Sequence, residues 1–425
     1  NTTGANNTAL GFAALDAAIL PSSNTSIGSA SLSVNVHSSQ NTAVGSNSLE
    51  SHNLGSAGNG LNTAVGYNSG LAVTTGIENT LMGALAGDAL TDADFNVAVG
   101  YQALTSDTLG SRSTALGYSA LANQNFTTAT DNYNTGLGWN AGGAMTTGLF
   151  NTFVGGLAGD ALTDADENVA VGQSSLTTDT KGSRNVAVGQ IALATQNFTT
   201  ATNSYNTAVG YAGGGAITTG INNTLVGALA GDALTDADYN VALGESALST
   251  DTLGSRNVAI GRATLANQNF TTATDSYNTG VGYGTGNAVT TGTRNTFVGA
   301  LAGDATDDGI LNTAMGYLAL SANCGNDNTA IGGECLLSVT GAQNTAVGRD
   351  AGGSVTGGGN NLILGFQAGL TGSPGGAITT GSNEICLGDE NITEAHIQVD
   401  WTVASDKRDK TDVTPMEMGL DFVNK

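Results

Sequence analysis

The chain has 425 residues, of which 35 are Asp or Glu and only 11 are Lys or Arg, so its formal net charge is −24. Such an acidic chain repels nucleic acid and anionic membrane surfaces, which excludes both as partners. Glycine is abundant, with 63 residues against 3 prolines, but it lacks the three-residue period of collagen. No run of 18 apolar residues occurs, so we expect no insertion into a membrane.

A five-residue motif, Asn-Thr-Ala-Val-Gly or a close variant, recurs along almost the whole chain, from Asn7 to Asn361. Most copies follow one another at a 17-residue spacing, as Asn79 and Asn96 do, but four steps have a 21-residue spacing. These longer steps run from Asn41 to Asn62, Ser113 to Asn134, Asn185 to Asn206 and Asn257 to Asn278. Three short steps and one long step together give a second, 72-residue period. Fixed periods of this kind indicate a stack of similar small units.

Each 17-residue repeat has the pattern of one coil of a β-solenoid, because it is too short for a helical repeat or a propeller blade. Thr-Ala-Val is typical of a short strand, and Gly and Asn supply the turns. We therefore predict an all-β, elongated β-solenoid (β-roll) of about 21 coils, on the order of 100 Å tall at the spacing of stacked strands. Residues 1–388 form this shaft, 389–404 are a connector, and 405–425 begin a different C-terminal segment.

The Asn that opens each motif has two roles open to it. Stacked coils align identical side chains, so these residues could form a continuous hydrogen-bonded ladder. Alternatively, each Asn could cap only its own turn.

An acidic segment returns three times with the 72-residue period. Its three aspartates lie within seven residues, at Asp88, Asp92 and Asp94, then Asp160, Asp164 and Asp166, and then Asp232, Asp236 and Asp238. They are candidate ligands for Ca²⁺, which takes six to eight oxygens and is the one cofactor that the sequence suggests. The segment lacks the Glu and Gly of the calcium-loop pattern. The alternative is that these aspartates cap turns and keep an exposed edge charged.

The longer steps each carry four extra residues, which must bulge out of the coil. Three of these bulges carry aromatic residues: Phe126, Phe198 and Phe270, followed by Tyr133, Tyr205 and Tyr277. Aromatic residues on loops are candidate contacts for a receptor, for sugars or for neighbouring chains. The alternative is that they cover coil edges or fill the axis of an oligomer.

The three cysteines, Cys324, Cys335 and Cys386, are too few for a disulfide framework. We expect them to pack as small buried hydrophobic residues. The three histidines show no metal-ligand spacing.

The longer pattern Asn-Thr-Ala-Val-Gly-x-x-Ala-Leu, as in residues 7–15 and, with variation, 96–104, resembles the head repeat of YadA-like trimeric adhesins. It is also similar to the related shafts of bacteriophage tail fibres. The resemblance covers residues 1–388. Proteins of this type are parallel trimers in which three β-rolls pack around one axis, so the resemblance implies a parallel homotrimer.

Residues 404–425 resemble the start of the endosialidase-type intramolecular chaperone found at the ends of phage tail fibres and spikes. Ser405, Asp406, Arg408 and Lys410 match the Ser-Asp-x-Arg-x-Lys stretch that opens that domain. In the family, the chaperone assembles the trimer and then cuts itself off between the Ser and the Asp. The resemblance implies that Ser405 is the nucleophile, Lys410 its base partner, and Ser405–Asp406 the bond that is cut. A Lys can take the Ser proton when burial lowers its pKa.

Two functions follow from these patterns. The first is the shaft of a phage tail fibre, an extracellular part of the virion that attaches to a polysaccharide or protein receptor on the host surface, with other virion tail proteins as partners. The alternative is a bacterial trimeric surface adhesin or an extracellular appendage protein. The shaft shows no catalytic pattern, and autoproteolysis at the chaperone junction is the only activity that we expect.

Overall fold

The computed structural model describes residues 3–396, which form strands and turns but no helix within that range. One strand from each coil joins a single 22-stranded sheet. Its strands, in spatial order, are β1 (Thr8–Leu10), β2 (Thr25–Ile27), β4 (Thr42–Val44), β6 (Thr63–Val65), β7 (Thr80–Met82), β8 (Val97–Val99), β10 (Thr114–Leu116), β12 (Thr135–Leu137), β13 (Thr152–Val154), β14 (Val169–Val171), β16 (Val186–Val188), β18 (Thr207–Val209), β19 (Thr224–Val226), β20 (Val241–Leu243), β22 (Val258–Ile260), β24 (Thr279–Val281), β25 (Thr296–Val298), β26 (Thr313–Met315), β27 (Thr329–Ile331), β28 (Thr345–Val347), β29 (Leu362–Leu364) and β30 (Ile385–Leu387).

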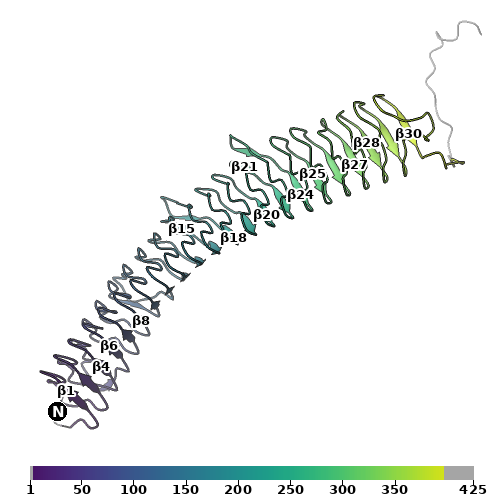
Figure 1. The fold of residues 1–425 in the computed structure, drawn as a ribbon. Helices are drawn as coiled ribbons and strands as arrows, with labels where there is room; N and C mark the ends of the chain where they lie inside the picture. The colour runs from purple at the N-terminus through teal and green to yellow at the C-terminus, as the bar shows by residue number, and fades with distance from the viewer. Residues whose placement is uncertain (1–2, 397–425) are drawn as a thin grey trace, which may run out of the picture. The chain divides into compact units, whose positions relative to one another are not determined.

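The strands stack in chain order, from β1 at the N-terminal end to β30, as Figure 1 shows. Each pairs in parallel with the strand of the next coil, so that equivalent motif positions lie opposite each other, as Ala187 does to Ala208. This is the predicted all-β solenoid with 17-residue spacing, which is therefore confirmed. The repeat is visible in the sequence because every coil must present the same residue type to the coils beside it.

The interior of the stack is built from small side chains. From β2 onward the middle residue of each strand is buried, while the first and third residues remain at least partly exposed, because strand side chains alternate between faces. The two largest middle residues are Phe153 and Phe297, and each lies opposite a glycine in the preceding strand, Gly136 and Gly280. A large and a small residue in neighbouring coils keep the core volume nearly constant.

The glycine that ends each motif is required by the close approach of successive coils. Gly100 has a φ of +134°, and a Cβ built on it would lie 2.4 Å from the carbonyl oxygen of Gly117 in the next coil. The same contact recurs at Gly117 against Gly138. A side chain at this position would push the coils apart and break the sheet.

The motif asparagines form a continuous hydrogen-bonded ladder. Of the two predicted roles, the ladder is therefore confirmed, and the cap of a single turn is not. The backbone N–H of Asn168 donates to the Oδ1 of Asn151 at 2.9 Å. The Nδ2 of Asn151 donates to the carbonyl of Ala165, in the next coil, at 2.8 Å. The pattern continues to Glu384, whose N–H donates to Asn361. It is broken at Ser113, where the Oδ1 of Asn132 accepts the N–H of Asn134 instead.

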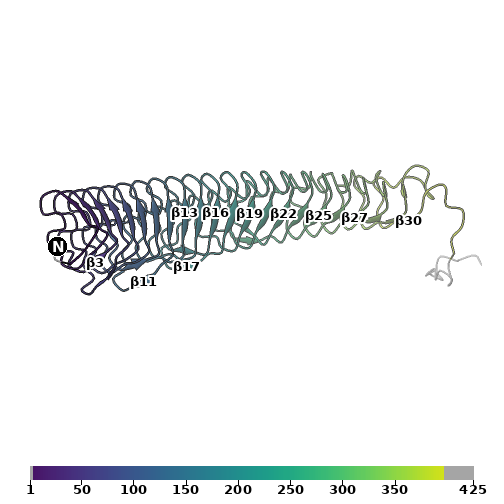
Figure 2. The same ribbon diagram turned by 90° about the horizontal axis from the view of Figure 1, so that it is seen from below.

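The four longer steps each add a two-stranded parallel sheet beside the stack. These sheets are β3 (Ser38–Ser39) with β5 (Gly58–Asn59), β9 (Gly110–Ser111) with β11 (Thr130–Asp131), β15 (Gly182–Ser183) with β17 (Thr202–Asn203), and β21 (Gly254–Ser255) with β23 (Thr274–Asp275). Figure 2 shows β3, β11 and β17 along one side of the stack. The repetitive unit ends at Asp389, and Glu390 begins a second unit.

Candidate functional surfaces

The outward side of the 22-stranded sheet carries an aliphatic stripe along its whole length, formed by the third residue of each strand. We define the outer face as the first and third residues of each strand together with two flanking rows described below. Every third-position residue, from Leu10 to Leu387, is Val, Leu, Ile or Met. None is fully buried, and Met82, Leu243 and Met315 are 43–46% exposed. A continuous aliphatic stripe on an exposed face is typical of an interaction surface.

The leading row lies along one edge of the outer face and consists of the residue before each ladder position. In the central coils it comprises Phe95, Arg112, Tyr133, Phe150, Glu167, Arg184, Tyr205, Asn222, Tyr239, Arg256, Tyr277 and Arg294. All have φ between +50° and +66°. Their side chains stack between coils: the Arg112 guanidinium lies 4.6 Å from the Phe95 ring centroid, and Tyr133 stacks on Phe150 at 5.8 Å.

The trailing row lies along the opposite edge and consists of the residue after each motif glycine. Its larger members are Phe12, Tyr67, Tyr101, Tyr118, Trp139, Gln173, Gln190, Tyr211, Glu245, Arg262, Tyr283, Tyr317, Arg349 and Phe366. Tyr101 and Tyr118 stack with ring centroids 5.4 Å apart. Arg262 pairs with Glu245 at 3.0 Å and lies over the Tyr283 ring. Both rows therefore mix aromatic and charged side chains beside the aliphatic stripe.

The aromatic residues predicted as receptor contacts divide into two groups. Phe126, Phe198 and Phe270 are buried, with 6–7% of each residue exposed, so these phenyl rings offer little surface to a receptor. Tyr133, Tyr205 and Tyr277 are 48–51% exposed and belong to the leading row. Each is flanked by an arginine, as Tyr133 is by Arg112 at 5.8 Å. The tyrosines, rather than the phenylalanines, are the aromatic groups that a partner can reach.

Each of the last three bulges is held by a buried aspartate that the sequence reasoning missed. Asp179 Oδ1 accepts the N–H groups of Gly182 at 3.0 Å and Phe198 at 3.1 Å, and its Oδ2 accepts Gln196 Nε2 at 2.6 Å. The Oε1 of Gln196 then accepts Asn206 Nδ2 at 2.8 Å. Asp107 and Asp251 make the same contacts. This network ties the bulge to the ladder and explains why the phenylalanines are buried.

The first bulge uses different residues at the same positions of the 72-residue period. Asn35 replaces the aspartate and His52 replaces the glutamine. His52 is fully buried, and its Nε2 forms a hydrogen bond with Ser38 Oγ at 2.7 Å. Burial lowers the pKa of His52 to about 4, so its imidazole is neutral at physiological pH.

The aspartates of each acidic segment contact different neighbouring coils, some the preceding coil and some the following one. Asp94, Asp166 and Asp238 each accept a backbone N–H from the preceding coil at 2.8 Å, from Ile77, Leu149 and Ile221. Asp88 and Asp160 accept the hydroxyls of Thr105 and Thr177 in the following coil. Asp92 and Asp236 accept Thr75 and Thr219, and Asp164 pairs with Lys181 at 3.5 Å. Burial raises the pKa of Asp88, Asp94, Asp160, Asp232 and Asp238.

No group of three His, Cys, Asp or Glu side chains within residues 3–396 is placed to hold a metal ion. Most aspartates of the acidic segments instead connect neighbouring coils by hydrogen bonds, and Asp164 does so by its ion pair with Lys181. Cys324, Cys335 and Cys386 are buried and unpaired, as expected, and burial raises the pKa of Cys335 to about 12.

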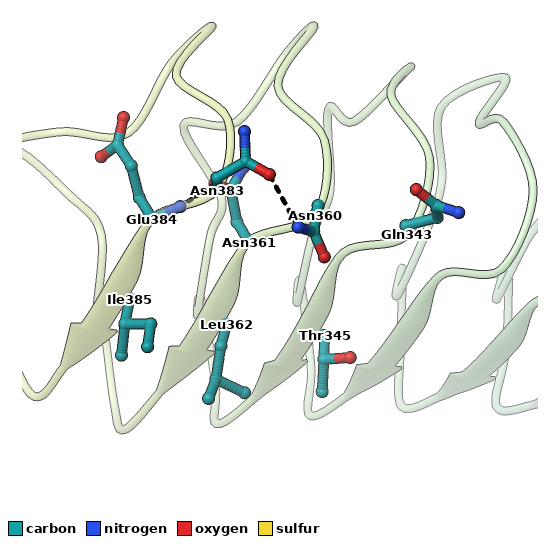
Figure 3. A pocket seen from close by; sticks show the side chains of 8 residues that line it. All are labelled: Gln343, Thr345, Asn360, Asn361, Leu362, Asn383, Glu384 and Ile385. Carbon is teal, nitrogen blue, oxygen red and sulfur yellow. Dashed lines mark hydrogen bonds between the residues drawn. The ribbon is translucent and has the colours of Figure 1, made fainter. Parts of the chain in front are cut away.

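A pocket of about 290 Å³ lies at the last coils of the stack. It is lined by Gln343, Thr345, Asn360, Asn361, Leu362, Asn383, Glu384 and Ile385. Figure 3 shows the amides of the leading row above the strand residues, with Asn360 Nδ2 donating to Asn383 Oδ1 at 2.7 Å. The pocket offers amide and carboxylate groups beside two aliphatic side chains, and no Lys, Arg or His lines it.

The predicted cleavage residues, Ser405 and Lys410, and the bond Ser405–Asp406, lie outside the described residues. Within the part of the chain that the structure describes, no helix could cross a membrane. Neither a protein-family model nor a curated protein matches this chain.

Proposed function

We propose that this chain is the shaft of a homotrimeric fibre of the bacteriophage tail-fibre type. The shaft holds the part that attaches to the host at a distance from the virion. Three copies pack with their outer faces toward a common axis. The observation that carries the proposal is the aliphatic stripe from Leu10 to Leu387, which no other part of residues 3–396 covers. Burial of apolar surface stabilises association by about 25 cal/mol per Å².

The design of the coil supports a rigid spacer. Each coil contributes one strand to one unbroken sheet, and the buried Asn ladder joins neighbouring coils. Because each coil contacts only its neighbours, length is gained simply by adding repeats. The receptor, a polysaccharide or a protein of the host surface, is bound elsewhere on the fibre, because the leading-row tyrosines lie on the face that packs toward the axis.

The resemblance of residues 404–425 to the intramolecular chaperone suggests how the fibre matures. We propose that Ser405, activated by Lys410, cleaves the Ser405–Asp406 bond once the trimer has formed. In this hydrolysis one water molecule is consumed. Ser405 gains a carboxylate, and Asp406 gains a free amino group.

The trimer is tested by charging the outer face. Replacing Val188 and Val209 with Lys should stop assembly, because six ammonium groups would be buried at two adjacent levels of the axis. The matched control is Thr200→Lys together with Thr199→Lys, since both threonines are exposed on a bulge. Multi-angle light scattering should report trimers for the control and none for the outer-face variant. Trimers of normal thermal stability for both variants would contradict the proposal.

A second test removes the chaperone. A chain that ends before Ser405 should yield no soluble trimer, because assembly depends on the C-terminal domain. A folded, stable monomer of this truncated chain would overturn the trimer proposal.

A further inference from the structure

We propose that neighbouring copies contact each other edge to edge with an offset of one coil, so that each leading-row residue of one copy faces the trailing-row residue of the preceding coil in the next copy. This inference rests on the trimer proposed above and specifies its interface. It assigns a role to the aromatic and charged residues of both rows.

The first step follows from symmetry. Along each motif, side chains point alternately inward and outward, so the leading row, the two outward strand residues and the trailing row form four parallel rows. The leading and trailing rows are the two edges of the outer face. In a cyclic trimer the contact is heterologous, so one edge of a copy meets the opposite edge of its neighbour.

The second step concerns height along the axis. A trailing-row residue follows the leading-row residue of its own coil by six positions in a repeat of 17. It has therefore advanced by about one third of the coil spacing of roughly 4.8 Å. The trailing-row residues nearest in height to a given leading-row residue are those of the same coil and of the preceding coil.

Charge separates these two registers. The same-coil register would place Arg256 of one copy against Arg262 of the next. Both guanidiniums are well exposed, with side-chain exposures of 42% and 59%, and each is paired with one carboxylate of its own chain at 3.0 Å, Arg256 with Asp275 and Arg262 with Glu245. The preceding-coil register places Arg256 against Glu245 instead. Opposite charges attract and like charges repel across an interface, so the offset register is favoured.

The same offset places two further leading-row arginines against aromatic rings. Arg294 then faces Tyr283 and Arg112 faces Tyr101. Tyr277 faces Arg262, which already lies 5.9 Å from the Tyr283 ring centroid within its own chain. An arginine that approaches an aromatic ring at such distances gains a cation–π interaction. The register thus extends a type of contact that each row already makes along the stack.

Paired cysteine substitutions can measure the register directly. The test pair is Glu245→Cys with Arg256→Cys, and the matched control is Arg256→Cys with Arg262→Cys. A third pair, Arg256→Cys with Tyr283→Cys, tests an offset in the other direction. Within one chain the two rows are separated by about 20 Å of extended backbone, whereas disulfide formation needs Cα atoms closer than about 7 Å. Any disulfide must therefore join two copies.

The protein expressed from its complete gene should form a covalent trimer on a non-reducing denaturing gel with the test pair. The control and third pairs should cross-link at least tenfold more slowly. The offset is wrong if either of these pairs cross-links as fast as the test pair, or if the test pair stays uncoupled in a protein that light scattering shows to be trimeric. A monomeric protein would instead overturn the trimer itself, so the two failures are distinguishable.

Discussion

The Asn ladder makes a sharp prediction at two adjacent asparagines, Asn222 and Asn223. Asn223 is buried, and its Nδ2 donates to the carbonyl of Ala237 at 2.8 Å and to Asn206 Oδ1 at 3.3 Å. Its Oδ1 accepts the N–H of Asn240 at 3.0 Å. Asn222 is half-buried in the leading row, and its side chain forms no hydrogen bond that the structure shows within residues 3–396.

Asn223→Asp keeps the acceptor but removes both Nδ2 donors, and it brings a carboxylate oxygen against the Ala237 carbonyl. Leaving a buried carbonyl unpaired and burying a charge without a cation should destabilise these coils by about 3–5 kcal/mol. Asn222→Asp adds the same charge on the surface, where we expect a change of no more than about 0.5 kcal/mol. The two variants therefore differ only in whether the ladder is altered.

Hydrogen exchange measured by mass spectrometry can resolve this local effect, because coils of a repeat protein open locally. Amides of residues 224–240 should exchange on the order of 100- to 1,000-fold faster in Asn223→Asp than in Asn222→Asp. Distant coils should be unchanged. Equal exchange rates in the two variants would refute the claim that the ladder holds the coils together.

Three further predictions test other parts of the molecule. Because the folded pKa of His52 is about 4, below the ordinary 6.5, the stability that depends on its neutral form is present above pH 6.5 and is lost as the pH falls toward 4. The loss should amount to about 3 kcal/mol. His52→Gln installs the residue found at positions 124, 196 and 268, and it should abolish the pH dependence of hydrogen exchange in the first bulge. A variant whose exchange depends on pH as the wild type does would contradict this. Ser405→Ala in the complete gene should leave a longer chain on a denaturing gel, and identical wild-type and variant bands would exclude cleavage at this bond. EDTA should leave the melting temperature unchanged, and a drop that Ca²⁺ reverses would show that the acidic segments bind calcium.

The repeat could be predicted from the sequence because identical positions must stack on one another. The 72-residue period likewise located the four bulges. The sequence left open whether the motif Asn joins coils or caps a turn, since both roles use the same amide. The structure shows Asn151 and its equivalents joining coils.

The buried aspartates could not be predicted from local patterns. Asp107 stands in the polar segment Ser-Asp-Thr, which is typical of a surface turn, but it is fully buried. It is buried because the bulge, which begins one coil later at Gln124, folds back over it. The one available signal was that Asp107 and Gln124 recur together with the 72-residue period. The burial of Phe126 follows from the same contact, so its buried position was equally hidden from the sequence.

The central claim, that three copies pack through their outer faces, is tested most directly by the mass of the assembled protein. Analytical ultracentrifugation of the protein from its complete gene should give three times the mass of its mature chain, with no dissociation on dilution to nanomolar concentration. A folded species with the mass of one chain, stable in solution with its aliphatic stripe exposed, would contradict the account.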